Sequence, residues 1–284
     1  MKIIRGSGEV PVIYTAHHAS HDFGEFTERV ALTEEQRIRF SDYGTSETVP
    51  LHGIATIVTE RSRALGDLNR DPDDSGRFQG QDYGQPQKHD IWKEGQELTE
   101  AEKQFCHANF YEPFHSEIVR LLASQEGPAM VVAWDNTAHY VIGNSERGES
   151  VTMKPFVLSN CGAEESAHPN SQEPTSCEPE FLELLSEIFA KELFKQGLPN
   201  EIHLNLVMKG GYICRQYSTL RNESELKTKG INIPVQSLQV EYDTVITHDQ
   251  VTLEPIPEKI TSLRLAFTNA ISRAYKQYFT GPTK

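Results

Sequence analysis

The chain has 284 residues, a length that one large α/β domain or two ordinary domains can fill. Its 41 acidic residues outnumber 27 basic ones, so the formal net charge is -14 and nucleic acid is excluded as a partner. No apolar run approaches the roughly 20 residues that cross a bilayer, and the N-terminus lacks the apolar stretch of a signal peptide. These two features predict a cytoplasmic protein with no membrane partner. The four cysteines form no CxxC pair, so we expect them to be reduced thiols.

Short apolar, β-branched runs alternate along the chain with helical patterns. The runs predict mostly buried strands at residues 10–15, 54–58, 129–134, 202–207 and 238–242. One helical pattern begins at a capping box formed by Thr99 and Glu102 and runs toward residue 122. A second begins near Pro179, and a third runs from about Glu258 to residue 278. This alternation predicts an α/β fold with a largely parallel or mixed sheet covered on both faces.

Two long stretches, residues 71–95 and 143–179, lack periodicity and are rich in polar residues, glycine or proline. Both are predicted to be loops. Loops of this length are often lids over a site, but a plain surface excursion fits the composition equally well.

Histidines and a carboxylate stand where predicted elements end or begin. TAHHASH places His17 and His18 after the first strand, Asp42 opens a segment that resembles a helix start, and His139 follows the third strand. Ligands of open α/β sheets bind at the carboxyl ends of strands. Two imidazoles, one carboxylate and water would form an open, catalytic zinc site, although each residue alone is weak evidence.

The strongest local signal is SRALGDLNR, which contains Arg63, Asn69 and Arg70 and follows a predicted strand. An arginine can grip a carboxylate through two hydrogen bonds, and a neighbouring asparagine can add a third donor. The motif therefore indicates a site for a substrate carboxylate. The alternative is a loop salt bridge between Arg70 and a nearby aspartate.

Near the C-terminus, LQVEYDTV alternates as a strand does, with Gln239 and Glu241 on the same face. If that face meets a metal ion, Glu241 can take a proton from the attacking water and pass it to the leaving amine. If it meets solvent, Glu241 is simply the polar half of the strand. The segment KGGYICRQYS predicts a tight turn flanked by Lys209 and Arg215, whose positive charge could serve substrate binding.

The order of these motifs resembles the N-formylglutamate amidohydrolase family, which belongs with the zinc carboxypeptidase and aspartoacylase group. HHAS, SDYG, DLNR, YEPFH, KGGYI and LQVE resemble six family segments in the same order, over about residues 10–243. The resemblance maps the zinc ligands of the family to His18 and Asp42, with His139 as the second histidine. It implies one zinc ion per chain.

The same resemblance assigns the remaining roles at the site. The family residues that hold the substrate carboxylate map to Asn69 and Arg70, and the arginine that polarises the scissile carbonyl maps to Arg63. The general base of the family maps to Glu241. Lys209 and Arg215 are expected to bind substrate as well. A local positive cluster in this acidic protein would then consist of Arg63, Arg70, Lys209 and Arg215.

The chain departs from the family pattern at two places. After the central strand the family usually has D-x-H-S, whereas this chain has TAHY, with Thr137 where the acid belongs and Asp135 two residues earlier. Either Asp135 replaces that acid after a local rearrangement, or the surroundings of His139 differ. His17 stands where the family has proline and could compete with His18 as a ligand.

The resemblance implies one catalytic domain over residues 1–284, with a three-layer α/β/α fold, a mixed central sheet and a zinc-peptidase (phosphorylase/hydrolase)-like topology. The expected partner is a small amide substrate that bears a carboxylate, and the expected reaction is hydrolysis of an N-acyl amino acid such as N-formylglutamate. Two alternatives stay open. One is a deacylase or carboxypeptidase-like hydrolase of another N-acyl amino acid or small peptide, and the other is a non-catalytic ligand-binding relative, which only Thr137 supports. The oligomeric state is not predicted.

Overall fold

A computed structural model describes residues 1–82, 89–137, 141–144, 150–152, 154–170 and 173–280. A seven-stranded mixed sheet lies at the centre of the molecule, and this confirms the predicted α/β fold. Its strand order is β1-β3-β2-β6-β11-β9-β10. The strands of this sheet are β1 (Lys2–Arg5), β2 (Val12–Ala16), β3 (Ala55–Val58), β6 (Ala129–Thr137), β9 (Phe156–Ser159), β10 (Ile202–Leu204) and β11 (Val235–Asp243).

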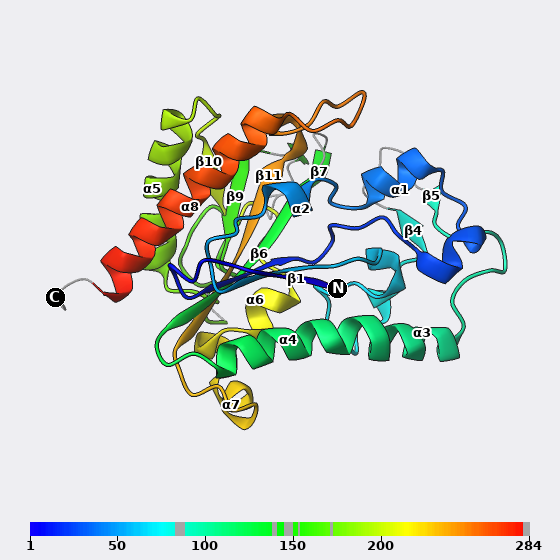
Figure 1. Ribbon diagram of the computed structural model, residues 1–284, viewed down its shortest axis with the longest axis horizontal. Helices are drawn as coiled ribbons and strands as arrows, with labels where there is room; N and C mark the ends of the chain where they lie inside the picture. Colours follow the sequence, from blue (N-terminus) through cyan, green and yellow to red (C-terminus); the bar gives the residue numbers. More distant parts are fainter. Residues whose placement is uncertain (83–88, 138–140, 145–149, 153, 171–172, 281–284) are drawn as a thin grey trace.

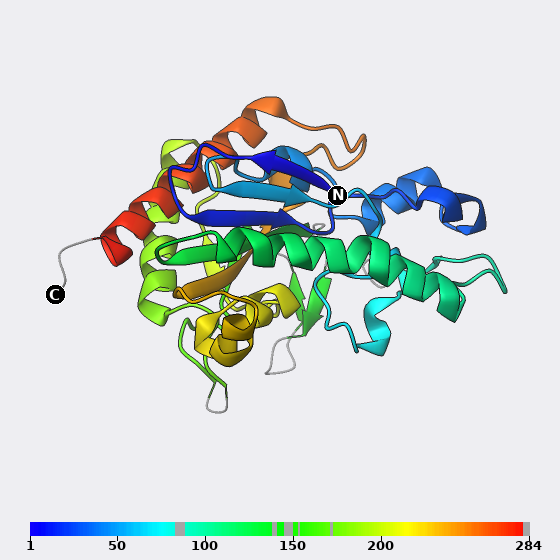
Figure 2. The ribbon, with the colours of Figure 1, turned by 60° about the horizontal axis from the view of Figure 1, so that its bottom comes forward.

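Helices cover both faces of the sheet (Figures 1 and 2). The long helices α5 (Pro179–Lys195) and α8 (Pro257–Phe279) pack side by side on one face, where Phe189 and Trp134 both contact the ring of Phe267. The opposite face is covered by α4 (Glu112–Ala123), α6 (Tyr212–Gln216) and α7 (Thr219–Thr228). The apolar residues of β2, β3, β6, β9 and β11 are thereby buried, as expected for strands that are covered on both faces.

Smaller elements surround these layers. The remaining helices are α1 (Glu34–Phe40), α2 (Thr45–Thr48) and α3 (Glu100–Cys106), with a π-helical segment η4 (His107–Tyr111) between α3 and α4. Four 3-10 turns are η1 (Gly24–Arg29), η2 (Arg63–Leu65), η3 (Ser75–Arg77) and η5 (Thr244–Ile246). Two two-stranded ribbons pair β4 (Gln81–Asp82) with β5 (His89–Asp90), and β7 (Val141–Asn144) with β8 (Ser150–Thr152).

The parallel centre of the sheet determines where a site can form. Strands β3, β2, β6 and β11 run parallel, so their carboxyl ends meet at one edge. The register places Glu241 of β11 opposite Asp135 of β6. Side chains that follow four separate strands are therefore brought together from positions far apart in the sequence.

Most of the predicted elements are present, with two corrections. The capping box at Thr99 is confirmed, because its hydroxyl accepts from the Glu102 N–H and the Glu102 carboxylate accepts from the Thr99 N–H. The prediction that residues 143–179 form only a loop was wrong, because β9 lies within that range and is fully buried. It has only four residues, three of them apolar, which is too few to stand out within a polar stretch. Strand β1, at the edge of the sheet, was not predicted.

In the part of the chain that the structure describes, no helix is both long enough and apolar enough to cross a membrane.

Candidate active site

A polar cavity of about 350 Å³ opens at the carboxyl edge of the central strands. Its walls come from the ends of β6 and β11, from the segments that follow β2 and β3, from the segment before α2, and from α6 with the loop before it. The described side chains that line it are His18, Asp42, Arg63, Asp67, Asn69, Arg70, Asp74, Asp135, Asn136, Thr137, Met208, Arg215, Gln239 and Glu241. Most of the site residues predicted from the sequence are in this lining, although they come from opposite ends of the chain.

His18 lies at the centre of a group of carboxylates. It follows β2, and its Nε2 is 2.7 Å from Asp67 Oδ1. Its Nδ1 is 3.3 Å from Asp42 Oδ2 and 3.6 Å from Asp135 Oδ1. An ionised aspartate at Nε2 orients the imidazole and directs Nδ1 toward the other two carboxylates, as in the carboxylate–histidine pairs of metal sites.

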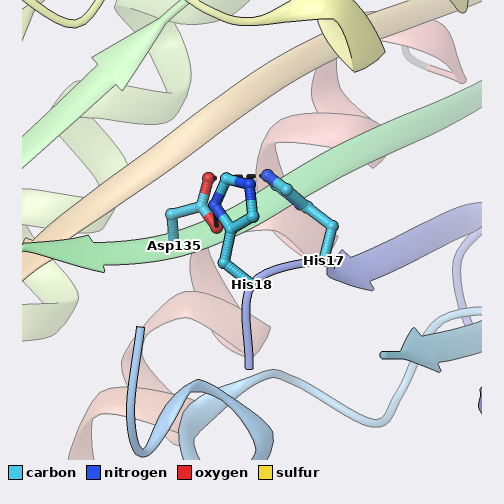
Figure 3. A group of neighbouring side chains, drawn as sticks. All are labelled: His17, His18 and Asp135. Carbon is cyan, nitrogen blue, oxygen red and sulfur yellow. Dashed lines mark ion pairs between the residues drawn. The ribbon is translucent and has the colours of Figure 1, made fainter. Parts of the chain in front are cut away.

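His17, the neighbour of His18, faces the same group from the other side (Figure 3). Its Nε2 is 2.9 Å from Asp135 Oδ2, and its ring centroid is 4.3 Å from that of His18. Donor atoms of His17, His18 and Asp135 all lie within 4.8 Å of one another. Among the described residues these three form a compact set of nitrogen and oxygen donors, all of them buried.

The charges in this group perturb one another strongly. Burial and Arg63 oppose protonation of His18, but Asp67, Asp135 and Asp42 outweigh them and raise its pKa to about 10. Burial, together with the charge on His18, lowers the pKa of His17 well below its usual value. Burial raises the pKa of Asp135 far above its usual value, and the nearby Asp42 raises it further. The cluster therefore favours positive charge at its centre.

Glu241 reaches the same cavity from β11. Gln239 Nε2 donates to Glu241 Oε1 over 2.6 Å, and the Thr137 hydroxyl donates to Oε2 over 3.1 Å. Burial raises the pKa of Glu241 well above its usual value, and Asp135 and Asp42 add to the effect. The face of β11 that carries Gln239 and Glu241 is buried and meets the cavity. The role of Glu241 as a base stays a prediction.

Arg63 supplies the positive charge nearest to these acids. Its Nη2 donates to Asp67 Oδ2 over 2.8 Å, and its Nη1 is 3.7 Å from Asp42 Oδ1. The guanidinium also lines the cavity. It therefore faces bound molecules while its position is fixed by two carboxylates.

Asn69 is held in place by the KGG turn. The Ile213 N–H donates to Asn69 Oδ1 over 3.0 Å, and the Gly211 N–H donates to Gln239 Oε1 over 2.9 Å. A Cβ at residue 211 would lie 2.2 Å from Asn69 Nδ2, so glycine is required there for the close approach. The turn thus ties the DLNR segment to strand β11.

The other predicted substrate-binding residues lie in different environments. Arg70 lines the cavity, but its Nη1 is also 3.1 Å from Asp74 Oδ2, so the anticipated loop salt bridge is present as well. Arg215 is exposed, lines the cavity and has no ion pair with another described residue. Lys209 is not among the described lining side chains; its backbone carbonyl accepts from the Cys161 N–H over 2.6 Å.

The predicted ligand His139 lies outside the described residues. Asp135 and Thr137, at which the chain departs from the family pattern, are both described at the end of β6. Asp135 contacts both His17 and His18, whereas Thr137 bonds to Glu241. Of the two residues, Asp135 is therefore the one that brings a carboxylate to the histidines after β2. The surroundings of His139 lie outside the described residues, so both alternatives stay open.

The residues present fit a divalent metal ion. Asp135 Oδ1 is buried, has no hydrogen-bond partner among the described residues, and points at the same space as His18 Nδ1 and Asp42 Oδ2. Buried carboxylate oxygens rarely lack partners unless a bound species satisfies them. Imidazole nitrogen and carboxylate oxygen are a donor set that suits zinc.

Comparison with known proteins agrees with this geometry. A sequence model of the N-formylglutamate amidohydrolase family matches residues 10–227, which is more than half of the chain. The chain belongs to this family. The family is one of amidohydrolases.

Two solved structures share the fold. The crystal structure of N-formylglutamate amidohydrolase from Ralstonia eutropha JMP134 superposes with a TM-score of 0.66 at 19% sequence identity, covering 96% of both chains. A gene product from Agrobacterium tumefaciens superposes with a TM-score of 0.58 at 14% identity, covering 96% of this chain and 94% of the other. No significant match was found among curated proteins.

Several residues of the site were not assigned a role from the sequence, among them Asp67 and Met208. Asp67 was noted only as part of DLNR, yet it orients His18, and its place between two cationic residues in SRALGDLNR was the available signal. Met208 precedes the KGG turn and lines the cavity. Nothing in its local pattern separates it from an ordinary strand-end residue.

Proposed function

We propose that this protein is a zinc-dependent hydrolase of the amide bond in an N-acyl amino acid, with N-formylglutamate as the representative substrate. One observation carries the proposal: Glu241 opens into the same cavity as the donor atoms of His18, Asp42 and Asp135. A carboxylate that can move a proton, next to a set of metal donors, is the arrangement used for metal-assisted amide hydrolysis.

We assign one zinc ion per chain to His18, Asp42 and Asp135, and His139 remains a further candidate from the sequence. His17 would support Asp135 from behind, since its Nε2 is 2.9 Å from Asp135 Oδ2. Bound zinc would supply a Lewis acid that polarises the scissile carbonyl and acidifies a water molecule. Asp67 would hold His18 in the orientation that presents Nδ1.

Glu241 would act as the proton carrier. It would accept a proton from the attacking water and deliver it to the departing amine, while Gln239 and Thr137 fix its two oxygens. Arg63 would donate to the oxygen of the carbonyl as negative charge develops there. The bond that breaks is the amide C–N bond, and the products are the free amino acid and the carboxylic acid of the acyl group.

The substrate carboxylate would bind at the basic side of the cavity. Asn69, Arg70 and Arg215 line that side, and they provide amide and guanidinium donors suited to a carboxylate. The protein carries a net charge of -14, so an anionic substrate needs such a local cluster. The four free cysteines support our expectation that the enzyme works in the reducing cytoplasm.

A panel of N-acyl amino acids, assayed for release of free amine by the zinc-loaded protein, tests the proposed reaction. We expect hydrolysis of N-formylglutamate and slower hydrolysis of amides that lack a carboxylate. Hydrolysis of other N-acyl amino acids or small peptides alone would favour the related deacylase or carboxypeptidase-like function. Binding of these compounds without any turnover would instead indicate a non-catalytic relative.

The ligand assignment is tested by metal content. His18→Ala, Asp135→Ala and His139→Ala are purified alongside the wild type, and zinc is measured in each by elemental analysis. If His18→Ala and Asp135→Ala lose zinc while His139→Ala retains it, Asp135 is supported as the ligand that β6 provides. The reverse pattern for Asp135 and His139 would restore the set predicted from the sequence, and unchanged zinc in all three would overturn both.

A further inference from the structure

Met208 differs in chemistry from every other side chain in the cavity lining. The other lining residues that the structure describes are all charged or polar, and Met208 alone is apolar. An acyl group on a substrate amide presents only hydrogen or hydrocarbon beyond its carbonyl. Within the described lining, such a group has one apolar surface on which to lie, and the surface is this thioether side chain.

The position of Met208 relative to Glu241, the proposed proton carrier, determines which part of a substrate Met208 would contact. Its Sδ is 3.8 Å from the Thr137 hydroxyl oxygen, and that hydroxyl donates to Glu241 Oε2 over 3.1 Å. Met208 is thus separated from Glu241 by a single hydroxyl. The carbonyl carbon under attack must lie next to Glu241, so the substituent on that carbon is the part within reach of Met208.

The backbone just before Met208 has an unusual conformation, which sets the direction of the Met208 side chain. Val207 has a φ of 59° and Asn205 a φ of 52°, in the left-handed region that β-branched residues such as valine rarely adopt. The buried Asn205 side chain accepts from the Asn160 N–H over 3.0 Å and donates to the Ser166 carbonyl over 2.6 Å. Strain held by such a network tends to occur where a side chain must be presented precisely.

Apolar packing behind Met208 limits its freedom as well. It packs on a small cluster built from Val157 and Leu206, both of them buried. The Ser159 hydroxyl donates to its carbonyl oxygen. Met208 therefore has a fixed position in the cavity lining, because Ser159 bonds to its carbonyl oxygen and its side chain packs on Val157 and Leu206.

We propose that Met208 is a specificity-determining residue that limits the size of the acyl group which the enzyme removes. This rests on the proposed amide hydrolysis and goes beyond it by assigning acyl selectivity to one side chain. With methionine at residue 208, the thioether and Glu241 leave room beside them for a formyl group, and each added carbon meets the methionine side chain. Shortening the side chain opens space for acetyl and propionyl groups.

The test compares N-formyl, N-acetyl and N-propionyl forms of one amino acid, each measured as kcat/KM. We expect the wild type to prefer the formyl substrate and Met208→Ala to shift the acetyl-to-formyl ratio by about tenfold or more, the scale of discrimination that one methyl group provides. Met208→Leu, which keeps the volume of the side chain, should preserve the wild-type ratio. Met208→Val provides an intermediate opening if the alanine variant does not fold.

Leu206→Ala is the matched control, because it removes bulk from the same cluster but not from the cavity lining. A shift with Met208→Ala and none with Leu206→Ala supports the assignment. An unchanged acyl ratio in folded, active Met208→Ala or Met208→Val overturns it, as does an equal shift with Leu206→Ala. A wild type that hydrolyses none of the three substrates would refute the proposed function itself, which is a different result from an unchanged ratio.

Discussion

The two sides of the cavity are built in different ways. The acidic side, which consists of His18, Asp42, Asp67, Asp135 and Glu241, is buried, and most of its polar atoms have partners on neighbouring elements. The basic side, which consists of Asn69, Arg70 and Arg215, includes two exposed guanidinium groups. The side chain of Asp67 is 1% exposed, whereas that of Arg70 is 44% exposed.

This difference indicates a division of tasks. Charges that are buried together interact strongly and hold a fixed geometry, which metal binding and proton transfer require. Exposed charges interact weakly with their neighbours because water and salt screen them. The basic side can therefore exchange its protein partners for a substrate carboxylate at little cost, whereas the acidic side cannot lose a member without leaving a buried charge unpaired.

The largest effect is expected on the acidic side from Glu241→Gln. A glutamine keeps the size of the side chain but cannot accept a proton at neutral pH, so turnover should fall by about 10²–10⁴-fold. Zinc and substrate binding should persist, because neither depends on this proton. Single-turnover hydrolysis and calorimetric titration on the same zinc-loaded sample measure both. Retention of more than about a tenth of the rate would show that Glu241 is not the proton carrier.

On the basic side, Arg70→Ala tests whether an exposed guanidinium anchors the substrate. Losing a hydrogen bond between charged groups costs about 1.5–3 kcal/mol, so KM should rise roughly tenfold to a hundredfold while zinc content stays unchanged. Asp74→Asn is the matched control, since it removes the negative charge of one of the two carboxylates that pair with Arg70, the other being Asp67, but leaves the guanidinium. If both variants behave alike, or if neither changes KM, Arg70 has only its structural role.

The fold was more accessible from the sequence than the site. Strands such as β2 and β11 are continuous apolar or alternating runs, so local pattern identifies them. The alternation of β11 also put Gln239 and Glu241 on one face, although it did not show that this face lines the cavity. Strand β9 was missed because its partners β11 and β10 are distant in sequence and provide the stabilisation that its length does not. Tertiary pairing of this kind leaves no local signal.

The metal donors illustrate the same limit at the level of side chains. The sequence shows that His18 follows a strand, but the three-dimensional register decides that Asp135 faces it and that Asp67 holds its other nitrogen. Lys209 was nominated for its charge beside two glycines. The backbone N–H of Gly211 in this turn donates to Gln239, and that of Ile213 just after it donates to Asn69, which a sequence pattern does not reveal.

A smaller effect is expected from Asp67→Asn, which probes the orientation of His18. The asparagine oxygen can still accept from His18 Nε2, but the negative charge that favours this imidazole orientation is lost. Substitution of such supporting carboxylates typically lowers metal affinity by about 10–100-fold. Competition with a chelating dye measures this directly. Asp74→Asn, in the same loop and without contact to His18, should bind zinc as the wild type does, and equal affinity in the two variants would contradict the role of Asp67.

The smallest effect concerns a histidine outside the cavity and contrasts it with His18. His52 is buried between the Tyr14 hydroxyl, 3.3 Å from Nε2, and the Thr268 hydroxyl, 3.2 Å from Nδ1, and burial lowers its pKa to about 4. An unfolded histidine has a pKa of about 6.5, so between about pH 6.5 and pH 4 the unfolded chain binds a proton that the folded protein does not. The folded state therefore loses stability as the pH falls through that window, by up to about 1.4 kcal/mol per pH unit from this group.

In His52→Gln, whose amide can still bond to both hydroxyls, this contribution is absent. Urea unfolding of the metal-free wild type and variant from pH 7 to pH 4.5 should show a shallower loss of stability in the variant. Equal slopes of stability against pH would mean that His52 takes up its proton in the folded state as readily as in the unfolded chain. Burial would then not lower the pKa of His52.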